Sequence, residues 1–333
     1  MIEPFGTTSN GISVERITIT GGGLTARVIT YGASLQDLRL EGHLPPLVLG
    51  FDTLSAYETH GRFFGATVGR FANRIAKGRF EIDGVAHHTD LNFRERHTLH
   101  GGSQGLGVKV WRIEDQTHHS VTFSIEDPDG AMGFPGNCRH TCTYSLEPNG
   151  TLAIIMESKT DAPTITSLAH HSYFILDDSG SCLDHTLRID ANAYLPVDED
   201  LIPTGEIRPV DSTDYDFSTP TPLRQRIANG ALFDHNFCLA NTPHPLTEIA
   251  EVASHKSGVK MIVATTEPGL QFYAAHAMDI PVTGLMGEPY GPHSGFALET
   301  QIWPDAPNHA NFPTPLLRPG ETRQQTTHYR FSK

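Results

Sequence analysis

The sequence predicts an all-β protein, built as a large antiparallel β-sandwich. Its 31 glycines and 23 prolines are scattered over 333 residues and leave little room for long helices. Between them, apolar and polar residues alternate in short runs, which is the period of a strand with one buried face. No helical segments alternate with these runs, as they would in a parallel βαβ fold.

The expected strands are short and follow one another closely. Two of them lie within residues 139–159 and are joined at Glu147-Pro148-Asn149-Gly150, because Asn-Gly supplies the positive φ angles of a tight hairpin turn. Helices are expected only at 53–59 and 222–229. Alternating apolar side chains mark four further strands: Leu24, Ala26 and Val28; Val121, Phe123 and Ile125; Met261 and Val263; Leu270 and Phe272.

Composition and charge favour a globular protein without nucleic-acid or membrane partners. Hydrophobic residues make up 38% of the chain, and no repeat or linker divides it, so a single domain over residues 1–333 is expected. The net charge is -14, and there is no basic run to attract a polyphosphate. The first thirty residues lack the features of a signal peptide, and no apolar run approaches about 18 residues. We therefore expect a cytoplasmic protein whose four cysteines are reduced.

Four polar clusters place ionisable residues beside glycines or aromatic residues at expected strand ends. The first comprises residues 69–75 and 99–102. There Arg74 offers a fork of donors to hydroxyl or carboxylate oxygens, and His100 precedes two glycines that leave room for a ligand. A structural ion pair and a turn cap explain these two residues equally well.

The second cluster, at 170–174, contains the adjacent residues His170 and His171. Successive side chains on a strand face opposite ways, so only one of the two can enter a given cleft. An imidazole with a pKa near neutrality is a natural proton donor to a sugar or carbonyl oxygen. A satisfied core histidine is the commoner situation.

The remaining two clusters each contain a carboxylate. Asp234 lies between aromatic residues at 233–237 and could accept hydrogen bonds from vicinal hydroxyls, or begin an Asx-type turn. Glu299 follows an apolar run that starts at 296, where partial desolvation would raise its pKa toward that of a general base. A solvated charge at a strand edge is the alternative.

Metal and phosphate sites are not expected. The adjacent pairs His87-His88, His118-His119 and His170-His171 lack the spacing of zinc ligands. The glycine run at 21–23 precedes an expected strand rather than a helix, which removes the argument for a phosphate cradle.

Taken in order, short motifs along nearly the whole chain make the sequence similar to the aldose 1-epimerase (galactose mutarotase) family. The resemblance implies a supersandwich of antiparallel strands with an open cleft, no cofactor, and a free monosaccharide substrate, such as galactose or glucose, whose α and β anomers interconvert. The motifs are ITYGA at 29–33, NRI at 73–75, LHGG at 99–102, HSYF at 171–174, LPVD at 195–198, DHNF at 234–237, PGLQFY at 268–273, ETQ at 299–301 and PDAPN at 304–308.

Carried over residue by residue, the resemblance implies an isomerase with Glu299 as general base and His171 as general acid. Ring opening removes the proton of the C1 hydroxyl while the ring oxygen receives one, so a carboxylate and an imidazole on opposite sides of the sugar would suffice. Rotation about C1–C2 and reclosure then give the other anomer. The sugar-binding residues that the resemblance implies are Asn73, Arg74, His100, Asp234 and Gln271.

Two positions depart from the family's pattern, and two other functions stay open. His170 and Ile175 stand where the family commonly has asparagine, so the hydrogen bonding that sets the tautomer of His171 is expected to differ. The alternatives are a carbohydrate-binding protein without catalysis, and a glycoside hydrolase that uses Asp234 and Glu299. Either a monomer or a homodimer is compatible with the sequence.

Overall fold

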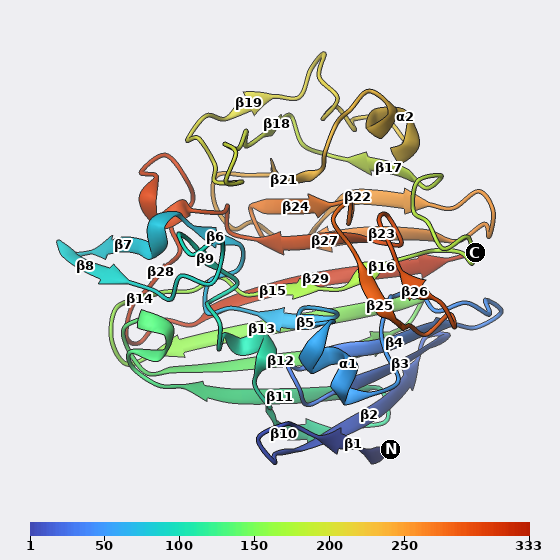
Figure 1. Cartoon of the computed structure of the whole chain (residues 1–333), viewed down its shortest axis with the longest axis horizontal. Helices are drawn as coiled ribbons and strands as arrows, with labels where there is room; N and C mark the ends of the chain where they lie inside the picture. Colours follow the sequence, from blue (N-terminus) through green and yellow to red (C-terminus); the bar gives the residue numbers. More distant parts are fainter.

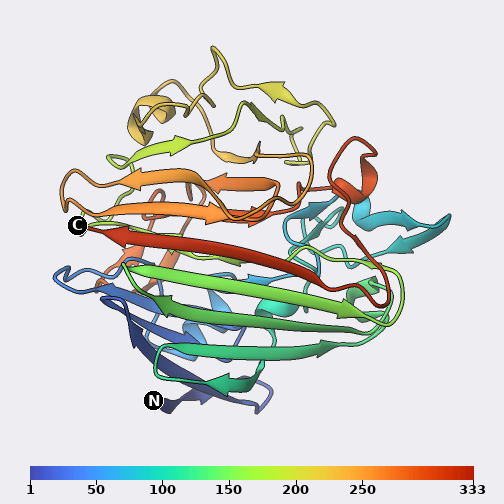
Figure 2. The same cartoon turned by 180° about the vertical axis from the view of Figure 1, so that it is seen from behind.

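The computed structural model describes residues 1–333, and most of its strands lie in three antiparallel sheets (Figure 1). The largest sheet has nine strands and crosses the whole molecule in the view from behind (Figure 2). In spatial order its strands are β10 (Arg112–Gln116), β11 (Ser120–Asp127), β12 (Cys138–Glu147), β13 (Thr151–Thr160), β29 (Arg323–Ser332), β23 (Lys260–Thr265), β22 (Thr247–Ala253), β17 (Thr186–Ile189) and β20 (Thr221–Pro222).

Two smaller sheets complete the sandwich. One is a meander of β1 (Ile2–Thr7), β2 (Ser13–Gly21), β3 (Leu24–Ile29) and β4 (Ser34–Leu40). The other has six strands in the order β16 (Tyr173–Phe174), β27 (Phe296–Gln301), β24 (Gly269–Tyr273), β21 (Asp234–Cys238), β18 (Ala193–Tyr194) and β19 (Arg208–Pro209). The prediction of an all-β antiparallel sandwich is confirmed.

The remaining elements are short. The helices are α1 (Leu54–Thr59) and α2 (Leu223–Ala228), at the two places where the sequence predicted them, and no helix has the length and apolar character needed to span a membrane. Five two-stranded pairs join the loops: β15 (Ala169–His171) with β5 (Ala66–Val68), β6 (Arg74–Ile75) with β9 (Thr98–Leu99), β7 (Arg79–Ile82) with β8 (Val85–His88), β14 (Thr164–Ile165) with β28 (Leu316–Leu317), and β25 (Ile280–Thr283) with β26 (Pro289–Tyr290).

The predicted hairpin is present with the expected turn. Strands β12 and β13 pair along their full lengths, from Glu147 opposite Thr151 at the turn to Cys138 opposite Thr160 at the far end. Asn149 and Gly150 have φ angles of 64° and 70°, the left-handed values that an Asn-Gly hairpin requires.

One core of 61 buried apolar residues fills the space between the sheets. The alternating side chains predicted for β3 contribute to it, and so do those of β23 and β24. A second, separate cluster of 11 buried residues includes Trp303 and Phe71. Ile302 and Trp303 of this cluster directly follow β27, so the smaller cluster lies beyond the end of that strand.

Candidate active site

The central strands of the six-stranded sheet carry a row of polar side chains on the face away from the main core. The pairing register places Gln271 of β24 opposite Glu299 of β27 on one side and opposite Asn236 of β21 on the other. Asp234 precedes Asn236 by two residues and therefore faces the same way. Intervening side chains such as Leu298 point into the core. The period of the strand thus separates a polar row from an apolar one.

A change of strand partner brings His171 to this row. In β15, His171 lies opposite Ala66 of β5, whereas in β16 Tyr173 lies opposite Ala297 of β27. The chain therefore joins the six-stranded sheet only after His171. We call this change of partner between β15 and β16 the fork. At the fork the Nε2 atom of His171 lies 3.6 Å from Oε1 of Glu299, and both side chains are almost fully buried.

The loop residues around β6 and β9 form the opposite wall. The backbone N–H of Asn73 donates to Nδ1 of His100 at 3.1 Å, and the backbone N–H of His100 donates to the carbonyl of Asn73 at 2.9 Å. Both residues have left-handed φ angles, of 63° and 50°. A Cβ at Gly101 would clash with the backbone oxygen of Gly69, so a glycine is required after His100.

Asp234 links the loop wall to the sheet. Its Oδ2 accepts a hydrogen bond from Nη2 of Arg74 at 2.9 Å, and its Oδ1 accepts one from Nε2 of Gln271 at 2.6 Å. The side-chain oxygen of Asn73 accepts from both the backbone and the Nη1 of Arg74, at 3.0 and 3.3 Å. The structure therefore brings all seven residues that the sequence singled out into one cleft.

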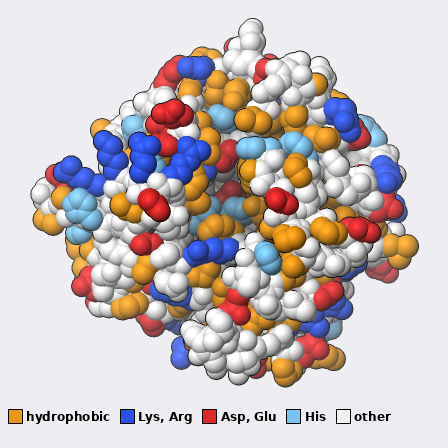
Figure 3. Space-filling model, viewed as in Figure 1, with side chains coloured by type: hydrophobic (Ala, Val, Ile, Leu, Met, Phe, Trp, Pro, Cys, Tyr) orange, Lys and Arg blue, Asp and Glu red, His pale blue; other side chains and the backbone are white.

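Several buried polar atoms in the cleft have no partner within the protein. They include Nδ1 of His171, Oε2 of Glu299, Oε1 of Gln271 and Nε of Arg74. Buried polar groups of this kind carry a desolvation cost unless they are hydrogen-bonded. Figure 3 shows a hollow near the centre of this face, with acidic and histidine side chains within it. A ligand rich in hydroxyl groups could satisfy both the free donors and the free acceptors.

The two carboxylates of the cleft have opposite electrostatic environments. Burial opposes ionisation of Asp234, but Arg74 and the hydrogen bond from Gln271 outweigh it and hold its pKa below the ordinary value. Burial raises the pKa of Glu299 to about 8, the negative charge of Asp234 adds to the rise, and Arg74 opposes it. Asp234 is therefore a fixed anion, whereas Glu299 can exchange a proton near neutral pH.

The two histidines are both neutral donors or acceptors at neutral pH. Burial lowers the pKa of His171 to about 4, although the negative charge of Asp234 acts in the opposite direction. Burial, followed by the neighbouring His171 and Arg74, holds the pKa of His100 well below 6.5. Because Nδ1 of His100 accepts the Asn73 N–H, its single proton lies on Nε2, where it can be donated into the cleft.

The same tautomer argues against a metal at this place. One ligand atom from each of His100, His171 and Glu299 lies within 4.8 Å of the others, as a cation would need. To ligate through Nε2, His100 would have to carry its proton on Nδ1, which already faces the N–H of Asn73. The three residues therefore do not fit a metal site.

The acid and base candidates lie side by side, which corrects the expectation that they flank the sugar. A gap of 3.6 Å between His171 Nε2 and Glu299 Oε1 leaves no room for a sugar ring between them. The two oxygens that exchange protons during ring opening, O1 and O5, are bonded to the same carbon. A neighbouring acid and base at one end of the sugar therefore meet the chemical requirement.

Comparison with known proteins decides the family. A sequence profile described as Aldose 1-epimerase matches residues 15–330. The chain is 41% identical to galactose mutarotase of Rattus norvegicus, over 97% of this chain and 96% of that protein. It is 34% identical to aldose 1-epimerase of Escherichia coli (strain K12), over 93% and 92% of the two chains. The chain belongs to the aldose 1-epimerase family.

Solved structures agree with this assignment. The GalM/aldose epimerase homologue from C. elegans superposes with a TM-score of 0.89 at 32% identity, over 95% of this chain and 98% of that one. Galactose 1-epimerase from Lactobacillus acidophilus NCFM has a TM-score of 0.85 at 26% identity, over 100% and 98%. This aldose 1-epimerase is thus an isomerase that acts on the anomers of aldoses, with the galactose mutarotase-like fold.

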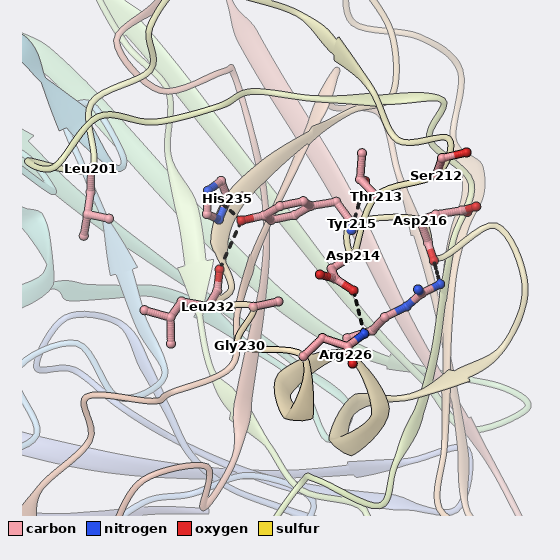
Figure 4. A pocket seen from close by; sticks show the side chains of 12 residues that line it. Leu201, Ser212, Thr213, Asp214, Tyr215, Asp216, Arg226, Gly230, Leu232 and His235 are labelled. Carbon is pink, nitrogen blue, oxygen red and sulfur yellow. Dashed lines mark hydrogen bonds between the residues drawn. The ribbon is translucent and has the colours of Figure 1, made fainter.

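The epimerase has a second hollow, whose lining includes His235 of β21 (Figure 4). It has a volume of about 840 Å³ and is lined by Tyr215, Asp214 and Arg226 among others. The hydroxyl of Tyr215 donates to the backbone oxygen of Leu232 and lies 3.3 Å from Nε2 of His235. None of the seven residues singled out from the sequence lines this hollow.

The two departures from the family's pattern face away from the epimerase cleft. His170 lies behind His171, where Nδ1 of its ring donates to the Tyr144 hydroxyl at 3.3 Å and Nε2 accepts from Ser172 Oγ at 2.7 Å. Ile175 is fully buried in the main core. Neither residue hydrogen-bonds to the ring of His171, so the expected change in its tautomer does not arise through them.

Sequence reasoning missed two aromatic residues of the cleft. The ring of Phe63 lies 4.8 Å from that of His100 and 5.9 Å from that of His171, between ring centroids. The guanidinium of Arg74 lies 4.7 Å from the centroid of Phe93. Both phenylalanines are in irregular loops, where no periodic pattern marks a side chain as facing the site.

Proposed function

We propose that this epimerase equilibrates the α and β anomers of free monosaccharides, galactose and glucose among them, with Glu299 as general base and His171 as general acid. The observation that carries the proposal is the buried pair itself, in which Nε2 of His171 and Oε1 of Glu299 lie 3.6 Å apart. Galactose is included because relatives at 40–41% identity are named galactose mutarotase.

The pair holds one exchangeable proton around neutral pH, because the pKa of Glu299 is about 8 and that of His171 is about 4. Ring opening begins from the arrangement in which this proton is on His171 and Glu299 is ionised. Glu299 takes the proton from the C1 hydroxyl while His171 gives its proton to O5, and the C1–O5 bond breaks. The products are an open-chain aldehyde, a neutral carboxylic acid and a neutral imidazole.

Ring closure reverses both transfers on the other face of the carbonyl. After rotation about C1–C2, His171 removes the proton of the C5 hydroxyl as O5 attacks C1, and Glu299 returns a proton to O1. Burial of Glu299 and His171 favours the neutral pair that accompanies the open chain. Arg74 lowers the pKa of Glu299 and Asp234 raises that of His171, so these two residues favour the ionised pair that the closed ring requires.

The remaining residues are assigned to sugar binding. Asp234 is an anion held by Arg74 and Gln271, and its carboxylate can accept hydrogen bonds from sugar hydroxyls. His100 offers a neutral Nε2–H donor, because Nδ1 accepts a backbone N–H. Asn73 acts mainly through Arg74. Its side-chain oxygen accepts hydrogen bonds from the backbone N–H and from the guanidinium of Arg74.

The same geometry weighs against a glycoside hydrolase. Hydrolysis by two carboxyls needs one of them to be protonated as the acid and the other to be ionised. Asp234 suits only the ionised role, because Arg74 and Gln271 bind its two oxygens. Glu299 would then have to be the acid, and this scheme would give no role to the buried imidazole of His171, which lies 3.6 Å from Glu299 and which ring opening uses.

Polarimetry tests the proposed function. Freshly dissolved α-D-galactose, α-D-glucose and L-arabinose are followed with native protein and with Glu299→Gln. The native protein is expected to speed the approach to an unchanged final rotation, and the variant is expected to lose roughly 10²- to 10⁴-fold in kcat. If the native protein bound sugar without speeding mutarotation, the proposed catalysis would be wrong and the protein would be a carbohydrate-binding protein. Full activity in the variant would remove Glu299 from the role of base.

The folding control uses the sign of the Glu299 pKa shift. Since burial raises this pKa from 4.5 to about 8, the native state resists ionisation, and the native protein loses this contribution to stability as the pH rises from about 4.5 through 8. Glutamine has no proton to lose. Glu299→Gln is therefore expected to melt at the same temperature as the native protein or higher at pH 8, and a much lower melting temperature would mean that lost activity reflects misfolding.

A further inference from the structure

Phe63 lies in the turn between α1 and β5, at the mouth of the cleft. Its ring is 5.9 Å from that of His171 with an interplanar angle of 29°, and 4.8 Å from that of His100. Unlike the two imidazoles, which are buried, Phe63 is partly exposed. Its ring therefore lies beside both imidazoles, while the residue stays partly accessible to solvent.

The turn that carries Phe63 is tied to both walls of the cleft. The backbone N–H of Gly65 donates to the carbonyl of His171 at 3.0 Å. Arg62 donates from Nη2 to the backbone oxygen of Ser103, just beyond His100. The Arg62 guanidinium also lies 5.7 Å from the centroid of Phe63. These contacts fix the ring in place, so its position over the two imidazoles does not depend on a loose loop.

The next residue shows which part of the turn is structural. Phe64 is buried in the main core, where its ring centroid lies 5.0 Å from that of Phe51 and 4.7 Å from that of Tyr173. The two adjacent phenylalanines thus have different surroundings. Phe64 packs in the main core and holds the turn, whereas Phe63 lies beside the imidazoles of the cleft. Phe63 packs against the small cluster of Ala66, Val68, Ala72 and Ala169, but it is only partly buried and its ring also lies beside both imidazoles.

We propose that Phe63 is a wall of the sugar site, which packs against the apolar C–H surface of the bound sugar and keeps water away from the imidazole of His171. The inference rests on the proposed function, because it assumes that the sugar lies beside His171 and Glu299. Aromatic rings offer sugars a flat, rigid, apolar surface at low entropic cost. Such a wall would orient the ring so that O1 and O5 meet the acid and base.

Of the residues that surround the His171 ring, Phe63 is one that carries no titratable group. The groups that face it from the other elements are Glu299 of β27, Asp234 of β21, Tyr173 of β16, His170 of β15 and His100 beyond β9. Burial is the largest cause that lowers the pKa of His171, to about 4. Removal of the Phe63 ring admits water to His171, so its pKa should return toward 6.5.

The experiment compares Phe63→Ala and Phe63→Tyr with the matched core variant Phe64→Leu. For Phe63→Ala we expect KM for galactose to rise roughly three- to tenfold. The acid midpoint of the pH profile of kcat/KM should also move up by one unit or more from about 4. Phe63→Tyr, which keeps the ring, should stay near native in both. Phe64→Leu should melt earlier but keep the native KM and profile.

The outcomes separate this inference from the proposed function. Native protein that speeds mutarotation, together with inactive Glu299→Gln, establishes the function irrespective of Phe63. Once the function is established, a native KM and a native acid midpoint in Phe63→Ala would show that Phe63 does not pack against the sugar. A raised KM with an unchanged midpoint would show that Phe63 does not keep water away from His171. If Phe63→Ala does not fold, Phe63→Leu carries the same test. Equal changes in KM and profile for Phe64→Leu would show a general packing effect, contrary to the proposal.

Discussion

Two carboxylates on one sheet face show how neighbouring groups assign different roles to the same chemistry. Asp234 has both oxygens bound by donors from Arg74 and Gln271, so it stays ionised despite burial. Glu299 has one oxygen facing His171 and the other without a partner, so burial raises its pKa to about 8. Only the second carboxylate can take up and release a proton during turnover.

At the scale of the residue, this difference predicts the pH dependence of activity. The reaction needs one shared proton on His171 and Glu299. Below about pH 4 both groups become protonated and no base remains, whereas above about pH 8 both lose their protons and no acid remains. We expect kcat/KM from polarimetry to be flat between these limits and to fall on either side. A midpoint near 6.5 on the acid side would show that His171 is exposed to water and would contradict the buried pair.

The sequence identified the candidate residues of the site one by one, but not their surroundings. The motif residues His171, Glu299 and Arg74 were identifiable because short ordered motifs carry them. Their distances and pKa values depend on contacts between segments more than 100 residues apart, such as that between His171 and Glu299. Phe63 belongs to no motif, and only the fold places it beside the imidazoles.

At the scale of the element, the fork between β15 and β16 is the feature that creates the site. The pairing of β16 with β27 ends where Tyr173 lies opposite Ala297. Beyond that point the carbonyl of Leu298, next to Glu299 in the chain, accepts a hydrogen bond at 3.0 Å from the hydroxyl of Tyr329 in the nine-stranded sheet. A side chain from the opposite layer thus binds the backbone of the catalytic strand at the place where its strand partner departs.

Tyr329→Phe removes this hydrogen bond and leaves the ring in place. We expect a loss of about 1–2 kcal/mol in the free energy of unfolding, because a buried carbonyl loses its donor. We also expect kcat to fall roughly three- to tenfold at unchanged KM, since Glu299 would be held less firmly. Urea unfolding and polarimetry measure the two effects. The matched control is Tyr290→Phe, whose hydroxyl donates to Gly50 O at 2.9 Å away from the catalytic strand. An equal fall in kcat in that control would contradict a local role.

Local elements were predictable where one short segment determines them. The hairpin at Asn149-Gly150 and the helices α1 and α2 needed only turn chemistry and spacing, and all three are present. The fork could not be predicted, because β15 and β16 are three and two residues long and their partners lie far away in sequence. A pattern of alternating side chains cannot be detected in strands this short.

At the scale of the whole molecule, the last strand joins two parts of the sandwich. Strand β29 pairs with β13 along one edge and with β23 along the other, as the red strand between the green and orange ones in Figure 2 shows. Residues from the middle and the end of the chain are therefore hydrogen-bonded to one C-terminal strand. We propose on this basis that residues 1–333 fold as a single unit.

The two tryptophans test whether the molecule unfolds cooperatively. Trp111 is buried in the main core, and Trp303 is buried in the smaller cluster beside the catalytic sheet. In Trp111→Phe and Trp303→Phe, the remaining tryptophan reports on one cluster alone. Because β27 contributes to the main core and leads directly into Trp303, we expect fluorescence and far-UV circular dichroism to give the same urea midpoint within each variant. A lower urea midpoint for Trp303 fluorescence than for circular dichroism would show that the smaller cluster around Trp303 unfolds independently. Residues 1–333 would then not fold as a single unit.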